Sequence, residues 1–216
     1  MKRLVEDEVN QGAILSSAAM RREDFLFYGG GKLITFIIGG ARSGKSSFAL
    51  NLANNYTSAK EGVRGGDEIS PTPKKAYIAT AQALDDEMKE RIEKHKKERP
   101  SDWITFEEPV NIAALIKDIQ DKYDIILFDC LTLWLSNLML NNLDLDMEKE
   151  IDLFCSSLFT VHCSLFIVSN EVGMGIVPDN ELSRRFRDLS GYLNQKVAEI
   201  ADEVYLVTAG IPIKIK

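Results

Sequence analysis

The chain has 216 residues, of which 45% are hydrophobic and 27% are charged, a balance typical of a globular protein with one sizeable core. Its formal net charge is −7, so the overall electrostatic field does not favour nucleic acid as a partner. A small anionic ligand, bound by a local group of basic residues, fits this charge better. The apolar stretches are too short to span a bilayer.

Two further features bear on the compartment. The start of the chain carries no apolar run behind its basic residues, so it lacks the pattern of a secretory signal. The three cysteines, Cys130, Cys155 and Cys163, are odd in number and do not have the spacing of metal ligands. We therefore expect reduced, mostly buried thiols in a cytoplasmic protein.

The first half of the chain alternates between strand and helix patterns. Residues 1–31 are mixed in polarity and end in three glycines, which predicts a peripheral N-terminal extension. The apolar, β-branched run at 34–40 predicts a buried parallel strand, and helical spacing follows over 46–56. A polar segment with Gly and Pro at 57–75 predicts a loop before a second strand at 75–80.

The second half continues this alternation. A helix is predicted over 84–99, because acids fill its first turn, bases fill its last and Pro100 follows it. A short edge strand is expected at 103–109, and buried strands are expected at 123–130, 164–170 and 202–209. A long helix at 180–200 precedes the last of these, and a final strand is expected at 211–216. Together these elements predict a single α/β domain over 32–216 with a mainly parallel central sheet.

The segment GGARSGKS matches the phosphate-binding pattern G-x-x-x-x-G-K-[ST]. Glycines let backbone N–H groups point at phosphate oxygens, the lysine reaches the β- and γ-phosphates, and the final hydroxyl ligates Mg²⁺. A strand before the motif and a helix after it predict a three-layer fold of the P-loop NTPase type. Lys45 is a candidate catalytic residue and Ser46 a candidate metal ligand. The candidate nucleotide-binding residues of this loop are Gly39, Gly40, Ala41, Arg42, Ser43, Gly44, Lys45 and Ser46.

Asp129 ends an apolar strand, which is the position of a Walker B carboxylate that holds Mg²⁺ directly or through water. The alternative is that Asp129 caps a helix that starts near Leu131. The phosphate loop favours the metal role. Because P-loop proteins include kinases, ATPases and switches, the loop by itself indicates a nucleotide and leaves the reaction open.

His95 stands in the basic stretch RIEKHKKERP. It is either a histidine on a solvated helix end or a nucleophile among phosphate-binding cations. Helical spacing places it on one face with Leu84, Met88 and Ile92, where the helix meets the body of the domain, but this position equally suits a boundary histidine. The other histidine, His162, lies in an apolar run, and we expect it to be packed or partly buried with no catalytic role.

Four segments occur in an order that resembles a known family. They are GGARSGKS, YIATAQALDDEMKERIEKHKKERP, SNEVGMGIVPDNELSRRFRDLSGYLNQ and VYLVTAGIPIKIK. Over about residues 33–216 the chain resembles the bifunctional adenosylcobinamide kinase / adenosylcobinamide-phosphate guanylyltransferases of cobalamin biosynthesis. The second and third segments are far more specific than the phosphate loop.

The resemblance implies two reactions. ATP or GTP phosphorylates the hydroxyl of the aminopropanol arm of adenosylcobinamide, and GTP then donates GMP to that phosphate, giving adenosylcobinamide-GDP and pyrophosphate. The transfer passes through a covalent GMP–histidine, which by position in the motif is His95, and a neutral imidazole suits this attack. The family also implies Mg²⁺, a homotrimer and adenosylcobinamide and its phosphate as partners.

The resemblance also implies further nucleotide contacts. It extends them to two short segments and two carboxylates, namely Ala79, Thr80, Ala81, Lys96, Lys97, Glu98, Arg99, Glu107 and Asp129. Glu107 is either a hydrogen-bond acceptor for guanine or a solvated acid on an edge strand. Where many members carry two adjacent histidines, this chain has Lys94-His95, and position 129 is often Glu in the family.

Other positions keep two interpretations open. Asn170 and Glu171 end a strand before GMGIVP, which is either a border of the active site or a rigid turn. Arg184 and Arg187 share a helix face and either bind phosphate or, through Asp188, form an ion pair. Two other functions are a kinase without nucleotidyl transfer and a nucleotide-binding switch, although the switch leaves the His95 helix and NEVGMGIVP unexplained.

Overall fold

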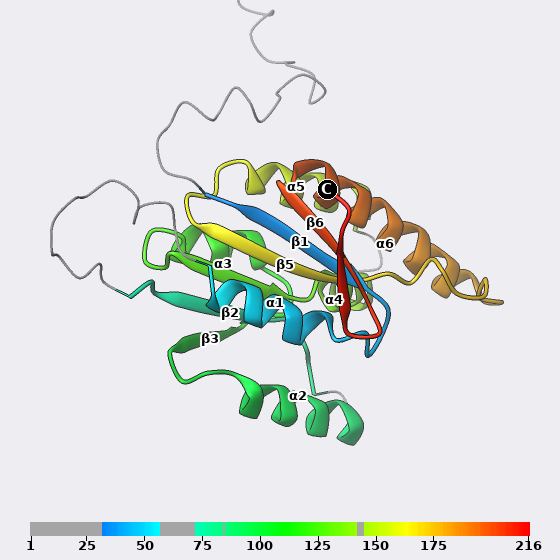
Figure 1. The fold of residues 1–216 in the computed structure, drawn as a ribbon. Helices are drawn as coiled ribbons and strands as arrows, with labels where there is room; N and C mark the ends of the chain where they lie inside the picture. Colours follow the sequence, from blue (N-terminus) through cyan, green and yellow to red (C-terminus); the bar gives the residue numbers. More distant parts are fainter. Residues whose placement is uncertain (1–31, 57–71, 84, 142–144) are drawn as a thin grey trace, which may run out of the picture.

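The computed structural model describes residues 32–56, 72–83, 85–141 and 145–216. In these ranges seven strands form one sheet in the order β3-β2-β4-β5-β1-β6-β7 (Figure 1). All neighbours pair in parallel except β6 and β7. The strands are β1 Ile34–Gly39, β2 Lys75–Ala79, β3 Trp103–Glu107, β4 Ile125–Asp129, β5 Ser164–Asn170, β6 Glu203–Thr208 and β7 Ile211–Lys214. The expected α/β fold with a mainly parallel sheet is confirmed.

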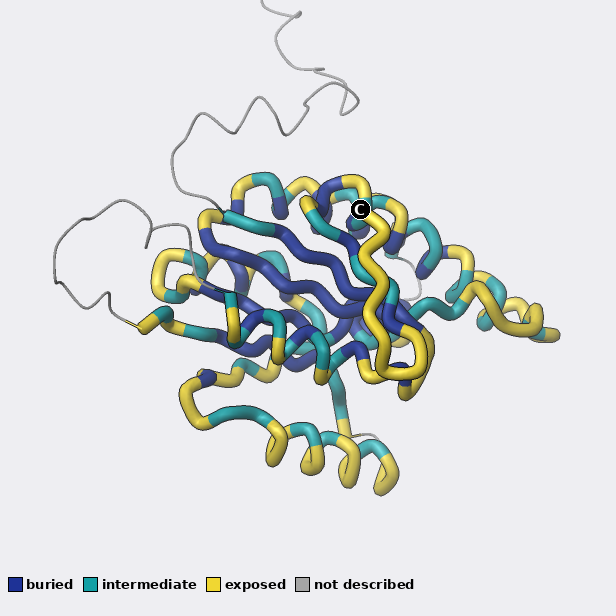
Figure 2. Tube along the Cα trace, in the orientation of Figure 1, coloured by how far each residue is buried: buried dark blue, intermediate teal, exposed yellow. Residues whose placement is uncertain are grey.

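Helices cover both faces of the sheet, which gives three layers (Figure 1). The helix α1, Lys45–Asn54, packs on one face against β1, β4, β5 and β6. The opposite face carries α3, α4, α5 and α6, which are Ile112–Ile119, Leu131–Asn141, Met147–Leu158 and Glu181–Ile200. The helix α2, Asp86–Glu98, lies at the β2–β3 end of the sheet, on the side of α1, and is largely exposed (Figure 2).

Alternating side chains of the central strands fill two separate cores, one on each face. In β1, Phe36 points into the larger core beneath α3–α6, and Ile37 points into the smaller core beneath α1. Both residues are fully buried. Strands covered on both faces need apolar residues at nearly every position, which explains the continuous hydrophobic runs of the sequence.

The order and type of the expected elements agree closely with the structure. The helix expected over 84–99 is α2, and the Asp85 carboxylate caps it by accepting a hydrogen bond of 2.7 Å from the Met88 N–H. The short helix α3 was not anticipated, since eight residues give too few turns for a clear periodic pattern. The extension expected at 1–31, and 57–71 of the expected loop, lie outside the described residues.

The sequence predicts mostly buried thiols at the three cysteines and a packed or partly buried side chain at His162. Cys130, Cys155 and Cys163 are free and buried, as expected. The expectation for His162 was wrong, because its side chain is exposed at the turn before β5. Its backbone N–H donates a hydrogen bond of 3.0 Å to the Gln120 side chain. None of the described helices is both long and apolar enough to cross a membrane.

The phosphate loop is held by the turn between β6 and β7. The Gly210 N–H donates a hydrogen bond of 2.8 Å to the Ser43 carbonyl, and a Cβ at Gly44 would lie 3.2 Å from the Gly210 Cα. Gly44 has a φ of 90°, which glycine adopts without strain. At Gly39, a Cβ would lie 2.3 Å from the Val207 carbonyl oxygen. Two of the motif glycines are therefore required by packing as well as by phosphate binding.

We predict that Gly39→Ala lowers the free energy of unfolding by about 1–3 kcal/mol, because the new methyl group overpacks against β6 backbone. Gly40→Ala is the matched control, since a Cβ there meets nothing within 4 Å. Urea denaturation of both variants measures the difference. Equal stability of the two variants would contradict the proposed close contact.

Candidate nucleotide-binding site

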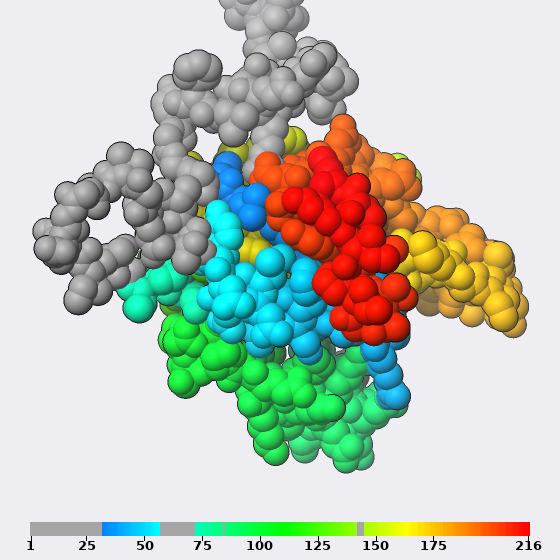
Figure 3. Space-filling model, in the orientation of Figure 1, coloured from blue at the N-terminus to red at the C-terminus, as the bar shows by residue number. Residues whose placement is uncertain are grey.

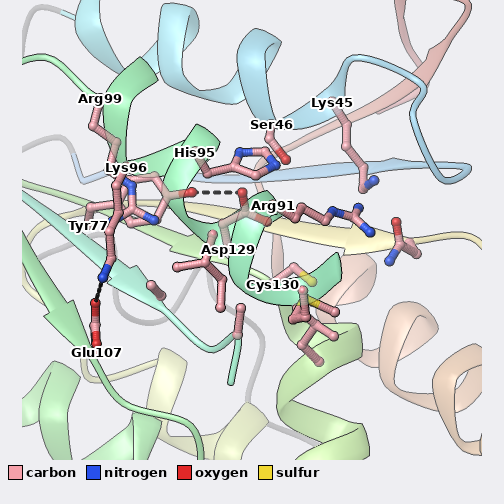
Figure 4. Close-up of a pocket in the computed structure, with 16 residues that line it drawn as sticks. Lys45, Ser46, Tyr77, Arg91, His95, Lys96, Arg99, Glu107, Asp129 and Cys130 are labelled. Atoms are coloured by element: carbon pink, nitrogen blue, oxygen red, sulfur yellow. Dashed lines mark hydrogen bonds and ion pairs between the residues drawn. The ribbon is translucent and has the colours of Figure 1, made fainter. Parts of the chain in front are cut away.

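A cavity lies at the carboxyl ends of β1, β2, β4 and β5, between α1 and α2. Its volume is about 120 Å³, and it shares Lys45, Ser46, Arg91 and His95 with an open groove of about 710 Å³. Figure 3 shows α2 lying against α1 on this face of the molecule. The cavity is lined by Lys45, Ser46, Tyr77, Ala79, Ala81, Met88, Arg91, Ile92, His95, Lys96, Arg99, Glu107, Asp129, Cys130, Leu133 and Asn170 (Figure 4).

Lys45 brings a buried cation to the cavity. Its residue is 6% exposed, and its Nζ donates a hydrogen bond of 3.3 Å to the Gly40 carbonyl at the base of the loop. Desolvation lowers the pKa of Lys45, because burial removes water from the charged amine. The first N–H groups of α1 follow directly after Gly44, so the positive end of the helix dipole points into the same region. This arrangement favours an anion.

Asp129 enters the cavity from the end of β4. The Tyr77 hydroxyl donates a hydrogen bond of 2.8 Å to Asp129 Oδ2 (Figure 4). Burial, followed by the Asp129 charge, raises the pKa of Tyr77 well above its ordinary value, so the phenol stays a donor. The second oxygen, Oδ1, has no hydrogen-bond partner among the described residues.

Ser46 and Asp129 line the same cavity and have the hard oxygen atoms that Mg²⁺ prefers. In the described part of the chain, no three His, Cys, Asp or Glu side chains are grouped to hold a metal ion. This small donor set fits Mg²⁺, which proteins commonly bind through one or two side chains, with water and substrate phosphates as the other ligands.

His95 lines the cavity and the groove from the inner face of α2. Ile92 and Met88, about one and two turns earlier, face the same cavity, as their helical spacing predicted. His95 Nδ1 lies 4.0 Å from Glu98 Oε2. Within α2, all of whose residues are described, no side chain is fully buried. The His95 imidazole is half-buried. It faces the cavity and the groove, where a substrate can reach it.

The basic residues near His95 divide between two sides of α2. Arg91, Lys96 and Arg99 line the cavity, whereas Lys97 lies in a separate shallow depression on the outer side with Asp86 and Glu93. The structure thus places Lys97 away from the other nucleotide-binding candidates. Helix geometry explains this, because consecutive residues are separated by about 100° around the axis.

Glu107 pairs with one of these cations. Lys96 Nζ lies 2.7 Å from Glu107 Oε1, and this hydrogen bond and charge raise the pKa of Lys96. The Glu107 side chain is 61% exposed on the edge strand β3. Because it borders the cavity, Glu107 is accessible to a ligand and positions Lys96 at the same time.

Other candidates take structural or groove positions. Thr80 is fully buried, and its hydroxyl bonds the backbone N–H and carbonyl of Cys130 at 2.8 and 2.9 Å, which joins β2 to the start of α4. Burial raises the pKa of Cys130 to about 12, so this cavity thiol stays protonated. Gly39, Gly40 and Ala41 do not line the cavity or the groove, whereas Arg42, Ser43, Gly44 and Glu98 line the groove.

Sequence reasoning gave no role to two cavity residues, Arg91 and Tyr77, and left two interpretations open for a third, Asn170. Arg91 precedes His95 by one helical turn, a spacing that could have identified it. Asn170 lines the cavity, as one interpretation of its segment predicted, and its buried Oδ1 has no partner among the described residues. Tyr77 carried no signal, since a tyrosine in a strand usually indicates packing.

Arg184 and Arg187 adopt the structural alternative. Arg184 donates to the carbonyls of Pro178 and Asp179 at 3.1 and 2.6 Å, and Arg187 pairs with Asp188 at 3.0 Å. Neither arginine lines the cavity. Arg184 therefore stabilises the segment before α6, and Arg187 neutralises the neighbouring Asp188.

The fold and this cavity define an α/β P-loop protein whose site suits a nucleotide. Over residues 35–215 the chain matches the family described as cobinamide kinase / cobinamide phosphate guanyltransferase. The chain belongs to this family, and the resemblance found in its motifs is confirmed.

Curated relatives support the same assignment. A bifunctional adenosylcobalamin biosynthesis protein CobP from Pseudomonas aeruginosa is 43% identical over 182 residues, covering 83% of this chain and 95% of the relative. The bifunctional adenosylcobalamin biosynthesis proteins CobU from Salmonella typhimurium and Escherichia coli are each 38% identical over 197 residues. These matches cover 85% of this chain and 100% of each relative.

The division of the basic residues yields a prediction. Lys96→Ala should weaken GTP binding by roughly threefold to tenfold, because it removes a cation from the cavity and leaves Glu107 unpaired. Lys97→Ala, one residue further and on the outer side of α2, should change the affinity by less than about twofold. Titration calorimetry compares the two variants. A larger loss for Lys97→Ala would contradict the placement of these side chains.

Proposed function

We propose that the protein is a bifunctional enzyme of adenosylcobalamin nucleotide-loop assembly, with adenosylcobinamide kinase and adenosylcobinamide-phosphate guanylyltransferase activities. One observation carries this proposal: the phosphate-loop residues Lys45 and Ser46 and the histidine His95 line a single cavity. A kinase needs the first group, and covalent nucleotidyl transfer needs the second. Family membership supports the pairing of these two reactions.

In the kinase reaction, the alcohol of adenosylcobinamide attacks the γ-phosphorus of ATP or GTP. A new O–P bond forms, the bond to the β-phosphate oxygen breaks, and the alcohol loses its proton as the nucleoside diphosphate leaves. Lys45 and the N–H groups at the start of α1 stabilise the charge that gathers on the phosphate oxygens. The carboxyl ends of β4 and β5 provide two further polar groups, Asp129 and Asn170.

In the guanylyl transfer, a nitrogen of the neutral His95 imidazole attacks the α-phosphorus of GTP, and pyrophosphate leaves. The phosphate of adenosylcobinamide phosphate then attacks the same phosphorus, breaks the N–P bond and restores the histidine. Arg91, Lys96 and Arg99 line the cavity beside His95 and stabilise the transferring phosphoryl group. The buried Nε of Arg99 has no hydrogen-bond partner among the described residues, so it can donate to a phosphate oxygen.

Ser46 and Asp129 would hold Mg²⁺ in both reactions. When bound, the ion would neutralise phosphate charge and orient the triphosphate. The proposed nucleotide contacts of Ala79 and Ala81 are supported by their position on the cavity wall at the end of β2. Thr80 would act indirectly, through its bonds to Cys130 below the cavity floor.

A homotrimer in the cytoplasm is the proposed state of the enzyme. The segment between β5 and α6 exposes Met174, Ile176 and Val177, whose exposed fractions are 80%, 97% and 61%. A group of exposed apolar side chains such as this one supports a contact between subunits. Three free, buried cysteines support a reducing compartment.

Labelling with α-phosphate-labelled GTP and Mg²⁺ tests the function. We expect wild-type protein to retain label after denaturation, in a linkage that survives base and is lost in acid, as a phosphoramidate is. His95→Ala should retain none. His162→Ala is the matched control, because it removes the other histidine, which is exposed and distant from the cavity, and it should label like wild type.

The kinase reaction provides the second control. His95→Ala should still transfer the γ-phosphate of a nucleotide to adenosylcobinamide, since Lys45 and Ser46 are intact. Wild-type protein that binds GTP but takes no label would refute the covalent mechanism. Phosphorylation without labelling would leave a kinase alone, and nucleotide binding with neither reaction would indicate a switch.

A further inference from the structure

Tyr77 connects several parts of the site, because it contacts Asp129, Arg99 and Trp103. It lies on β2, next to β4, and its side chain is on the same sheet face as the smaller core. The residue is 5% exposed, so its hydroxyl has little access to water. Its hydroxyl donates a hydrogen bond of 2.8 Å to Asp129 Oδ2, which fixes the Asp129 carboxylate from a neighbouring strand.

The Tyr77 ring is itself held on two sides. The Arg99 guanidinium carbon lies 3.9 Å from the ring centroid, which is close enough for a cation–π contact. Trp103 packs edge-on against the ring, with 6.4 Å between centroids and an interplanar angle of 77°. The phenol therefore has little freedom to turn, and its hydroxyl is directed at one oxygen of Asp129.

A carboxylate on a short side chain can present either oxygen to a metal ion. A rigid donor that occupies Oδ2 leaves Oδ1 as the available metal ligand, and Ser46 lines the same cavity as Asp129. Residues that orient metal ligands from behind contribute to metal affinity, often by a factor of ten or more. The hydroxyl of Tyr77 has the geometry of such a residue.

We propose that Tyr77 is a positioning residue, whose hydroxyl orients the Asp129 carboxylate for Mg²⁺-nucleotide. This inference rests on the proposed function, which assigns Asp129 to Mg²⁺. Tyr77 touches neither the transferring phosphoryl group nor the nucleophile in this account. Since Arg99 caps α2 four residues after His95, the same ring also links the metal side of the cavity to the histidine helix.

The test is the Mg²⁺ dependence of nucleotide binding in Tyr77→Phe. Phenylalanine keeps the ring that Arg99 and Trp103 contact and removes the hydroxyl alone. The probe is guanosine 5′-[α,β-methylene]triphosphate, whose α–β bond His95 cannot break, titrated with and without Mg²⁺. We expect the half-saturating Mg²⁺ concentration to rise about tenfold, with metal-free nucleotide affinity unchanged.

Tyr205→Phe is the matched control. Its hydroxyl also bonds a carboxylate, Glu203 Oε2 at 3.1 Å, but on β6 and outside the cavity. It should leave Mg²⁺ dependence at the wild-type value. In a double-mutant cycle, Tyr77→Phe should add little to the loss caused by Asp129→Ala, because both act through one carboxylate.

The possible results distinguish a failure of the positioning role of Tyr77 from a failure of the proposed function. If wild type needs Mg²⁺ and Tyr77→Phe matches it, the positioning role is refuted while the proposed function stands. If Tyr77→Phe weakens metal-free binding and lowers thermal stability without shifting the Mg²⁺ curve, the hydroxyl is structural and the inference is also refuted. If wild-type binding does not respond to Mg²⁺, the metal role of Asp129 falls, and the inference falls with it.

Discussion

Parallel pairing of β2, β4, β5 and β1 is the constraint on which the site depends. Parallel strands bring their carboxyl ends to one edge of the sheet, and in this order the phosphate-loop strand, the Asn170 strand and the Asp129 strand are consecutive neighbours. Residues more than 80 positions apart in the sequence thereby meet at one cavity. Ligands commonly bind at this edge of open α/β sheets.

Charge and burial together make the cavity a favourable environment for anions. Lys45 is buried and partly desolvated, and Arg91, Lys96 and Arg99 add positive charge from α2. This local group of cations belongs to a chain with a net charge of −7. A bound triphosphate would compensate the cations from both walls at once.

The sequence predicts most of this architecture, because its signals are local. Apolar runs identify the buried strands, and the glycines, Lys45 and Ser46 identify the phosphate loop. The spacing of Met88, Ile92 and His95 correctly places the histidine on the inner face of α2. The signals fail where neighbours are distant in sequence, and the Tyr77–Asp129 bond joins residues that are 52 positions apart.

The orientation of single side chains is hard to predict for the same reason. The resemblance implies a nucleotide contact for Lys97, whereas the helical turn directs its side chain to the outer side of α2. His162 was expected to be packed because its neighbours are apolar, yet the turn before β5 exposes it. A sequence pattern describes an average environment, whereas the rotation of one residue about a helix or a turn decides which surface it meets.

The proposed function requires that one cavity serves both the phosphate loop and His95. A competition experiment tests this requirement. GMP labelling of the protein is followed while adenosine 5′-[β,γ-imido]triphosphate is added. Its concentrations are those that a direct titration shows to saturate the phosphate loop. The account predicts that labelling is inhibited competitively, with an inhibition constant equal to the titrated Kd. Labelling that continues at the full rate on the saturated protein would show two separate nucleotide sites and contradict the account.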